Sequence, residues 1–195
     1  LRIANSDITN ISGISYCENL SLLYMSGNPI TNIHHLTNLT RLKVLDIADT
    51  SLSNLSSDYV QSSLRGITGL EKLWIGSNGL DDTSFPDLST LPLTDLNIYD
   101  NGLTALGSIS TIDTLTSLTL DKNSISDFSP LAALDSLQTL SISSMSLADL
   151  SSVSGLVQLL RLVCSDNNLT SLEDISTLTN LSMLRADSNG ITNVA

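Results

Sequence analysis

The sequence predicts an α/β solenoid, in which short units stack to form a parallel β-sheet on one side and 3₁₀ turns or short helices on the other. Two observations predict this fold class. An eight-residue pattern with apolar first, third and last positions recurs nine times along the 195 residues. Between the copies, an apolar residue recurs about every third position, as in Ile33, Leu36, Leu39 and Leu42.

The nine octets have a nearly constant spacing. Successive copies are separated by 22, 22, 28, 23, 22, 22, 22 and 22 residues. Alternation of apolar and polar residues within each octet predicts a short strand that buries one face. One unit cannot bury a core alone, but stacked units cover one another, which predicts a solenoid. The octets are LRIANSDI (1–8), LYMSGNPI (23–30), LDIADTSL (45–52), LWIGSNGL (73–80), LNIYDNGL (96–103), LTLDKNSI (118–125), LSISSMSL (140–147), LVCSDNNL (162–169) and LRADSNGI (184–191).

The segments between the octets predict the second side of the array. Their period-three apolar spacing suits a 3₁₀ turn or short helix packed behind the strand. A longer insertion at 51–72 adds six residues, and Tyr59, Val60 and Leu64 in it predict a short helix on the convex side. Cys17 and Cys164 occupy positions that are apolar in other units, so we expect both to be buried as small hydrophobic residues.

The sixth octet position predicts a ladder of asparagines. An asparagine side chain can satisfy backbone groups that a sharp turn leaves unpaired, and stacked units would repeat this arrangement. Ser6 and Thr50 keep a hydroxyl group, whereas Met145 has no group that can substitute. We therefore expect local weakness or a compensating water near residues 143–147, and a higher melting temperature for Met145→Asn. The asparagines are Asn28, Asn78, Asn101, Asn123, Asn167 and Asn189.

The pattern LxxLxLxxN with a period-three apolar tail resembles the leucine-rich repeat family. Its 22-residue units are similar to those of bacterial internalins and of eukaryotic SDS22-like proteins. The resemblance implies a right-handed curved array with a concave parallel sheet, convex 3₁₀ or short helical segments, and protein binding through the concave face. Because the chain starts at the first residue of an octet and stops just after another octet, we expect residues 1–195 to be a single array of about nine units, cut from a longer chain without its caps.

Composition argues against several classes of function. The net charge of −12 disfavours nucleic acids and acidic membrane surfaces as partners. No apolar stretch approaches the ~18 residues of a membrane-spanning helix. The two cysteines and the adjacent His34 and His35 match no metal-binding or nucleophilic motif. We expect neither enzymatic activity nor a metal or cofactor.

The strand alternation predicts which side chains lie on the concave face. The second and fourth octet positions point away from the core, and the fifth flanks them. Tyr24, Trp74 and Tyr99 then gather on one half of that face, beside the small residues Ser26, Ala48 and Gly76, which would leave room for an inserted side chain. The acidic residues Asp46, Asp49, Asp95, Asp100 and Asp121 rim the aromatic group. The candidate binding residues are Tyr24, Asp46, Asp49, Lys72, Trp74, Asn97, Tyr99 and Asp121.

These residues predict a monomeric protein–protein interaction module whose partner has a basic surface, with apolar anchors surrounded by Lys or Arg. A structural spacer or adhesin stalk of a cell-surface protein is an alternative, as is an SDS22-like scaffold that regulates a phosphatase. Few Lys and Arg with abundant Ser, Thr and Asp favour a cell-surface or secreted array over a cytoplasmic or nuclear one. Sequons at Asn10, Asn19, Asn38, Asn54, Asn168 and Asn180 fit glycosylation, but the repeat itself also generates such triplets.

Overall fold

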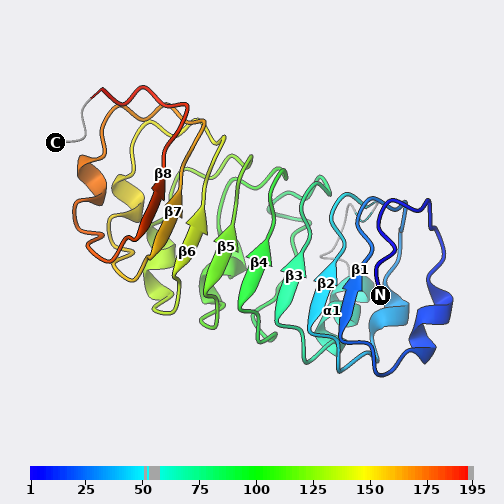
Figure 1. The fold of residues 1–195 in the computed structure, drawn as a ribbon. Helices are drawn as coiled ribbons and strands as arrows, with labels where there is room; N and C mark the ends of the chain where they lie inside the picture. Colours follow the sequence, from blue (N-terminus) through cyan, green and yellow to red (C-terminus); the bar gives the residue numbers. More distant parts are fainter. Residues whose placement is uncertain (51, 53–57, 193–195) are drawn as a thin grey trace.

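The computed structural model describes residues 1–50, 52 and 58–192, which form an elongated stack of similar units (Figure 1). One eight-stranded parallel sheet runs along the stack with its strands in sequence order. An isolated bridge between Arg2 and Tyr24 adds the first octet to its edge. The predicted solenoid is confirmed. The strands are β1 (Leu22–Tyr24), β2 (Val44–Asp46), β3 (Lys72–Trp74), β4 (Asp95–Asn97), β5 (Ser117–Thr119), β6 (Thr139–Ser141), β7 (Arg161–Val163) and β8 (Met183–Arg185).

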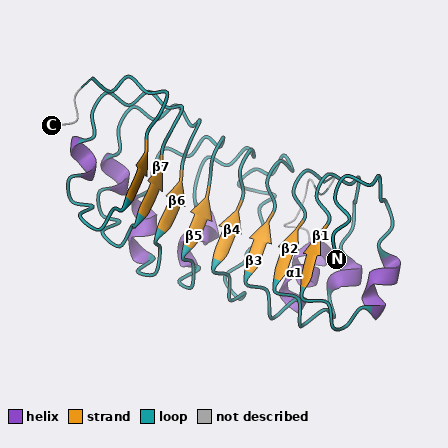
Figure 2. Ribbon diagram, in the orientation of Figure 1, coloured by secondary structure: helices purple, strands orange, loops and turns teal. Residues whose placement is uncertain are grey.

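The helical segments form a second row, separate from the row of strands (Figure 2). Each 3₁₀ segment follows an apolar residue of the period-three pattern; in the second unit, Leu36 N–H donates to the Ile33 carbonyl at 2.9 Å. The segments are η1 (Ser12–Tyr16), η2 (His34–Leu36), η3 (Gly107–Thr111), η4 (Ser129–Ala133), η5 (Ser151–Val153) and η6 (Glu173–Ile175). In the part of the chain that the structure describes, no helix has the length and apolar character needed to span a membrane.

The core lies between these two rows. Neighbouring strands pair without any shift in register, so that Leu23, Leu45 and Leu73 lie side by side across β1, β2 and β3. All three side chains are fully buried, as are Ile33 and Leu36 behind them. Each leucine layer is therefore covered by the next unit, which is how a three-residue strand contributes to a stable core.

The two irregular units differ from the others on the helical side. The insertion forms α1 (Asp58–Gly66), as predicted, and buries Val60 and Leu64; the side chain of Tyr59 and the sequon at Asn54 lie outside the described residues. In the next unit a turn replaces the helical segment. Asp81 holds this turn by accepting hydrogen bonds from the hydroxyl groups of Thr83 and Ser84, which lower the pKa of its carboxyl group to about 2.

The asparagine ladder is present as predicted. Asn78 Nδ2 donates to the carbonyl groups of Ile75 in its own unit and Ile47 in the preceding unit, at 3.1 and 2.9 Å. Its Oδ1 accepts from the backbone N–H and the hydroxyl group of Thr50. The Ile75 carbonyl also accepts from Asn101 Nδ2, so this one carbonyl accepts hydrogen bonds from the side-chain amides of two successive units. The ladder thus ties each turn to the unit before it.

Met145 interrupts this ladder. Its own N–H donates to Asn167 Oδ1 of the following unit at 3.0 Å. Its thioether does not replace the asparagine Oδ1 that would accept hydrogen bonds from the preceding unit. Among the described residues, the backbone N–H groups of Asn123 and Ile125 therefore have no acceptor. The equivalent groups of Met145 and Leu147 both donate to Asn167 Oδ1. The missing amide therefore leaves two backbone donors unpaired in the part of the chain that the structure describes.

The fifth octet position has a backbone role that the sequence analysis missed. In all nine units this residue has a positive φ, from 51° at Asn5 to 66° at Gly27. Left-handed backbone is costly for most L-residues and least so for Gly, Asn and Asp. The abundance of short polar residues in this column was the available signal, and Lys122 is the exception, with φ 57°.

Cys17 contradicts its predicted burial. Cys164 is buried, but Cys17 is exposed beside an apolar hollow of about 240 Å³ lined by Leu1, Ile11 and Ile14, among others. Cys17 follows η1, and none of the described residues stacks on that side of η1. Cys17 therefore holds a core position of the repeat pattern, but no unit among the described residues covers it.

Candidate functional site

The outward face of the sheet, called the sheet face below, carries the predicted site residues of the second octet position. The register places Tyr24, Asp46, Trp74 and Asn97 in one row across β1 to β4. All four are half-buried, because neighbours in the row cover their sides. The strand alternation therefore determines which side chains are exposed, and the in-register pairing determines which of them are neighbours.

Tyr24 and Trp74 lean toward each other across the strand between them. Their ring centroids are 5.8 Å apart with an interplanar angle of 49°. Asp46 lies in the row between the two rings, and its carboxylate accepts hydrogen bonds from the Ser26 hydroxyl group at 2.9 Å and from Ala48 N–H at 3.1 Å. These bonds fix the orientation of a carboxylate that the rings partly shield from water.

Tyr99 occupies the space that the sequence analysis expected to be free. A Cβ atom at Gly76 would clash with the Cδ1 and Cε1 atoms of the Tyr99 ring, so the ring lies directly over the glycine. Gly76 is buried beneath this ring, and Ala48 is only 7% exposed. The expectation that small residues leave open room is therefore wrong at Gly76, because the Tyr99 ring of the same protein occupies the space above this glycine.

A hollow of about 300 Å³ lies on this part of the sheet face. Two of the three predicted aromatic residues, Trp74 and Tyr99, line it, and so do the two carboxylates Asp46 and Asp49. We call this feature the sheet-face hollow. Its lining residues are Asn5, Ser26, Gly27, Asp46, Ala48, Asp49, Trp74, Asn97 and Tyr99.

The remaining candidate residues do not line the hollow and instead interact with other side chains of the sheet face. Lys72 Nζ lies 3.6 Å from Asp95 Oδ2, and Trp74 Nε1 donates to Asp95 Oδ1 at 3.4 Å. Asp121 accepts from the Ser141 hydroxyl group and Ser143 N–H, both at 2.7 Å. The predicted acidic rim is therefore divided. Asp46 and Asp49 line the hollow, whereas Asp95 and Asp121 interact with side chains of neighbouring strands.

Arg2 is a sheet-face residue that the sequence analysis did not single out. Its guanidinium carbon lies 4.3 Å from the centroid of the Tyr24 ring, a cation–π geometry. Arg2 and Tyr24 both stand at the second octet position of adjacent units, which was the signal in the sequence. A guanidinium group thus already stacks on an aromatic ring of this face.

A second group of exposed side chains lies at the other end of the sheet. Arg161 donates to Met183 Sδ at 3.3–3.4 Å, and Arg185 forms a loose ion pair with Asp187 at 3.8 Å. Both arginines are exposed and belong to β7 and β8. These basic side chains are separated along the sheet from the acidic hollow, so the sheet face has two regions of different charge.

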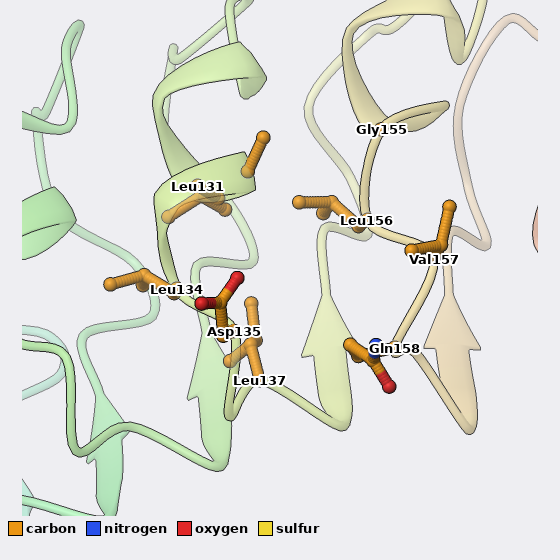
Figure 3. A pocket seen from close by; sticks show the side chains of 9 residues that line it. Leu131, Leu134, Asp135, Leu137, Gly155, Leu156, Val157 and Gln158 are labelled. Carbon is orange, nitrogen blue, oxygen red and sulfur yellow. The ribbon is translucent and has the colours of Figure 1, made fainter.

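The helical side of the array has a smaller pocket of about 120 Å³ between two neighbouring units (Figure 3). Leu131, Leu134 and Leu137 line it from one unit, and Leu156 and Val157 from the next. Its only charged lining residue is Asp135. This pocket is a gap in the side-chain packing at the edge of the core, and none of the candidate site residues lines it.

Groups with potential chemical reactivity are few. His34 and His35 stack at 3.6 Å between ring centroids on η2, and His34 Nδ1 lies 2.7 Å from Asn32 Oδ1. Burial raises the pKa of the Cys164 thiol to about 11, which keeps it protonated at neutral pH. No group of three or more His, Cys, Asp or Glu residues is arranged to hold a metal ion in residues 1–50, 52 and 58–192.

Comparison with solved structures gives consistent neighbours, although no protein-family model and no curated protein sequence matches the chain. An internalin (inlF) from Listeria monocytogenes aligns over the whole chain with a TM-score of 0.73 and 26% identity; the chain spans 62% of its length. Internalin C2 of the same species aligns over the whole chain with a TM-score of 0.60 and 29% identity, over 74% of its own length.

A leucine-rich repeat protein of Leptospira interrogans has a TM-score of 0.74 and 27% identity, over 94% of this chain and 47% of that protein. The TM-scores of these neighbours show that they share the overall solenoid architecture described above. The repeat, the asparagine ladder and these similarities together show that the chain has the leucine-rich repeat fold.

Proposed function

We propose that this chain is a non-enzymatic protein-binding module that holds its partner against the sheet face, with the sheet-face hollow as the anchor point. The juxtaposition of Trp74 and Tyr99 around this hollow is the observation that carries the proposal. Aromatic side chains supply large contact area at low entropic cost and dominate the energy of protein interfaces. The fold itself does not require them, because in later units the second octet position accepts Thr and Ser and the fourth accepts Asp and Ser.

The charge of the hollow favours a partner with a basic surface. Asp46 and Asp49 line it, and the whole chain carries a net charge of −12. Complementary charge accelerates association and selects against acidic partners. The stack of units also gives the sheet face a length that suits a folded protein rather than a small molecule.

The experiment compares Trp74→Ala with Tyr16→Ala. Tyr16 is a matched control because it is also aromatic, is 88% exposed, and lies on η1 away from the sheet face. A protein captured from the source cells is purified, and its dissociation constant is measured for both variants after circular dichroism confirms their folding. We expect Trp74→Ala to weaken binding by about 30-fold or more, as for a hot-spot residue, and Tyr16→Ala by less than about twofold.

Two outcomes contradict the proposal. A purified partner that binds Trp74→Ala as tightly as the unmodified chain places the interface elsewhere. If no protein binds saturably, the structural spacer becomes the better explanation of the array. The SDS22-like alternative would need Asp121 to act together with the aromatic residues, but Asp121 is engaged by β6 and does not line the hollow.

A further inference from the structure

We infer that the sheet-face hollow accepts an arginine side chain presented by the partner protein, an assignment that rests on the proposed function. The sequence alone favoured an apolar anchor surrounded by basic residues. The structure reverses this arrangement, because the carboxylates line the hollow itself and Tyr99 fills the space over Gly76.

The first argument is the unbalanced charge of the hollow. Its nine lining residues include Asp46 and Asp49 but no Lys or Arg. Among the described residues, neither carboxylate has an ion-pair partner, whereas nearby Lys72 is paired with Asp95. A cation entering the hollow would therefore meet two carboxylates that the chain does not neutralise.

The second argument is the remaining hydrogen-bonding capacity of Asp46. A carboxylate has about four acceptor sites. Each oxygen of Asp46 accepts one bond from the chain, Oδ1 from Ala48 N–H and Oδ2 from the Ser26 hydroxyl group. Roughly two acceptor sites remain, enough for a forked donor such as guanidinium. An apolar side chain in the same place would remove water from this carboxylate without replacing its hydrogen bonds.

The third argument is the aromatic wall. Guanidinium is planar and stacks on aromatic rings, whereas an ammonium group acts as a compact point charge. Trp74 and Tyr99 both line the hollow, and its volume of about 300 Å³ has room for one side chain but not for a folded element. Arg2 on Tyr24, at 4.3 Å, shows the same pairing within this face.

The test uses the intrinsic fluorescence of Trp74, the only tryptophan in the chain. The chain is titrated with N-acetylarginine amide and, in parallel, with the amides of N-acetylcitrulline, N-acetyllysine and N-acetylleucine. Citrulline is the neutral isostere of arginine. We expect saturable binding of the arginine probe with a dissociation constant on the order of 1 mM, at least about fivefold tighter than binding of any of the other three.

Matched variants locate the binding. Asp46→Asn removes the central charge, and Asp49→Asn does the same at an exposed turn residue whose left-handed backbone an asparagine tolerates. Asp166→Asn is the control, because Asp166 holds the same octet position as Asp49, with φ 56°, in a distant unit. We expect each hollow variant to weaken arginine binding by about fivefold, and the control to change it by less than about twofold.

The outcomes separate this inference from the proposed function. The arginine assignment is overturned if the leucine, citrulline or lysine probe binds as well as arginine, or if no probe binds up to about 50 mM. If Asp49→Asn also binds arginine normally, the assignment fails even when Asp46→Asn does not fold. A partner protein lost by Trp74→Ala but retained by both Asp variants would leave the binding module intact and refute only the arginine anchor.

Discussion

Replacing Met145 by asparagine would complete the ladder that ties the turns of the array together. The missing amide leaves the backbone N–H groups of Asn123 and Ile125 without an acceptor among the described residues, although Ile125 is only 1% exposed. In the following unit, Asn167 Oδ1 accepts both equivalent groups, from Met145 and Leu147. We therefore expect Met145→Asn to stabilise the protein, even though it removes a buried apolar side chain.

The magnitude follows from opposing contributions. Pairing two shielded N–H groups gains about 1 kcal/mol each at the low end of the usual range, and two new amide donations gain ~0.5–1.5 kcal/mol each. The carbonyl groups of Leu120 and Ile142 can receive these donations, since each accepts from one asparagine amide whereas the Ile75 carbonyl accepts from two. Loss of the Met145 side chain, 8% exposed, costs about 1.5–3 kcal/mol. The net gain is about 1–2 kcal/mol.

Calorimetry and amide hydrogen exchange test this prediction together. For a chain of this length, the gain corresponds to a rise in melting temperature of about 3–6 °C. Met145→Leu is the matched control, because it keeps the apolar volume and restores no hydrogen bond. The N–H groups of Asn123 and Ile125 should exchange more slowly in Met145→Asn only. A melting temperature below that of Met145→Leu, or unchanged exchange at both groups, would refute the reasoning.

Three further predictions concern reactivity and backbone strain. Native protein at pH 8 should react with one equivalent of a chromogenic thiol reagent, at exposed Cys17, and denatured protein with two, because burial raises the pKa of Cys164 to about 11. Lys122→Gly should raise the free energy of unfolding by about 0.5–1 kcal/mol, measured by urea denaturation, because φ is 57° at this position. Asp81→Asn should lower the melting temperature at pH 7, because hydroxyl hydrogen bonds to the ionised carboxylate lower its folded-state pKa and thereby stabilise the fold. This stabilisation is lost when the carboxylate is protonated, so the difference between the variant and the unmodified protein should vanish as the pH falls from 3.8 to about 2.

The regular part of the fold could be predicted because each unit repeats the same physical problem. Nine phased octets gave the strand positions, the buried leucines and the asparagine ladder, and the insertion gave α1. Cys17 was placed incorrectly because burial in a solenoid depends on the next unit as well as on the residue itself. The left-handed fifth position was missed because short polar residues there are also typical of an exposed surface.

The candidate site was less predictable because it depends on contacts between columns. The alternation placed Tyr24, Asp46 and Trp74 on one face, but it could not show that the two rings lean together across Asp46. It also could not show that Tyr99 turns toward Gly76. These arrangements depend on side-chain torsions, which a period of two along a strand does not specify.

Gly76 shows how a repeat constrains some exposed positions while leaving others free. The fourth octet position accepts Ser, Asp or Tyr elsewhere in the array, so the fold does not need glycine there. The need comes from Tyr99, whose ring lies where any larger side chain would stand. Substituting Gly76 by alanine should therefore displace the ring and reshape the hollow while leaving the leucine core intact. The core and the sheet-face hollow are thus separable in this array: the core depends on the first and third octet positions, and the hollow depends on pairs of residues from neighbouring units.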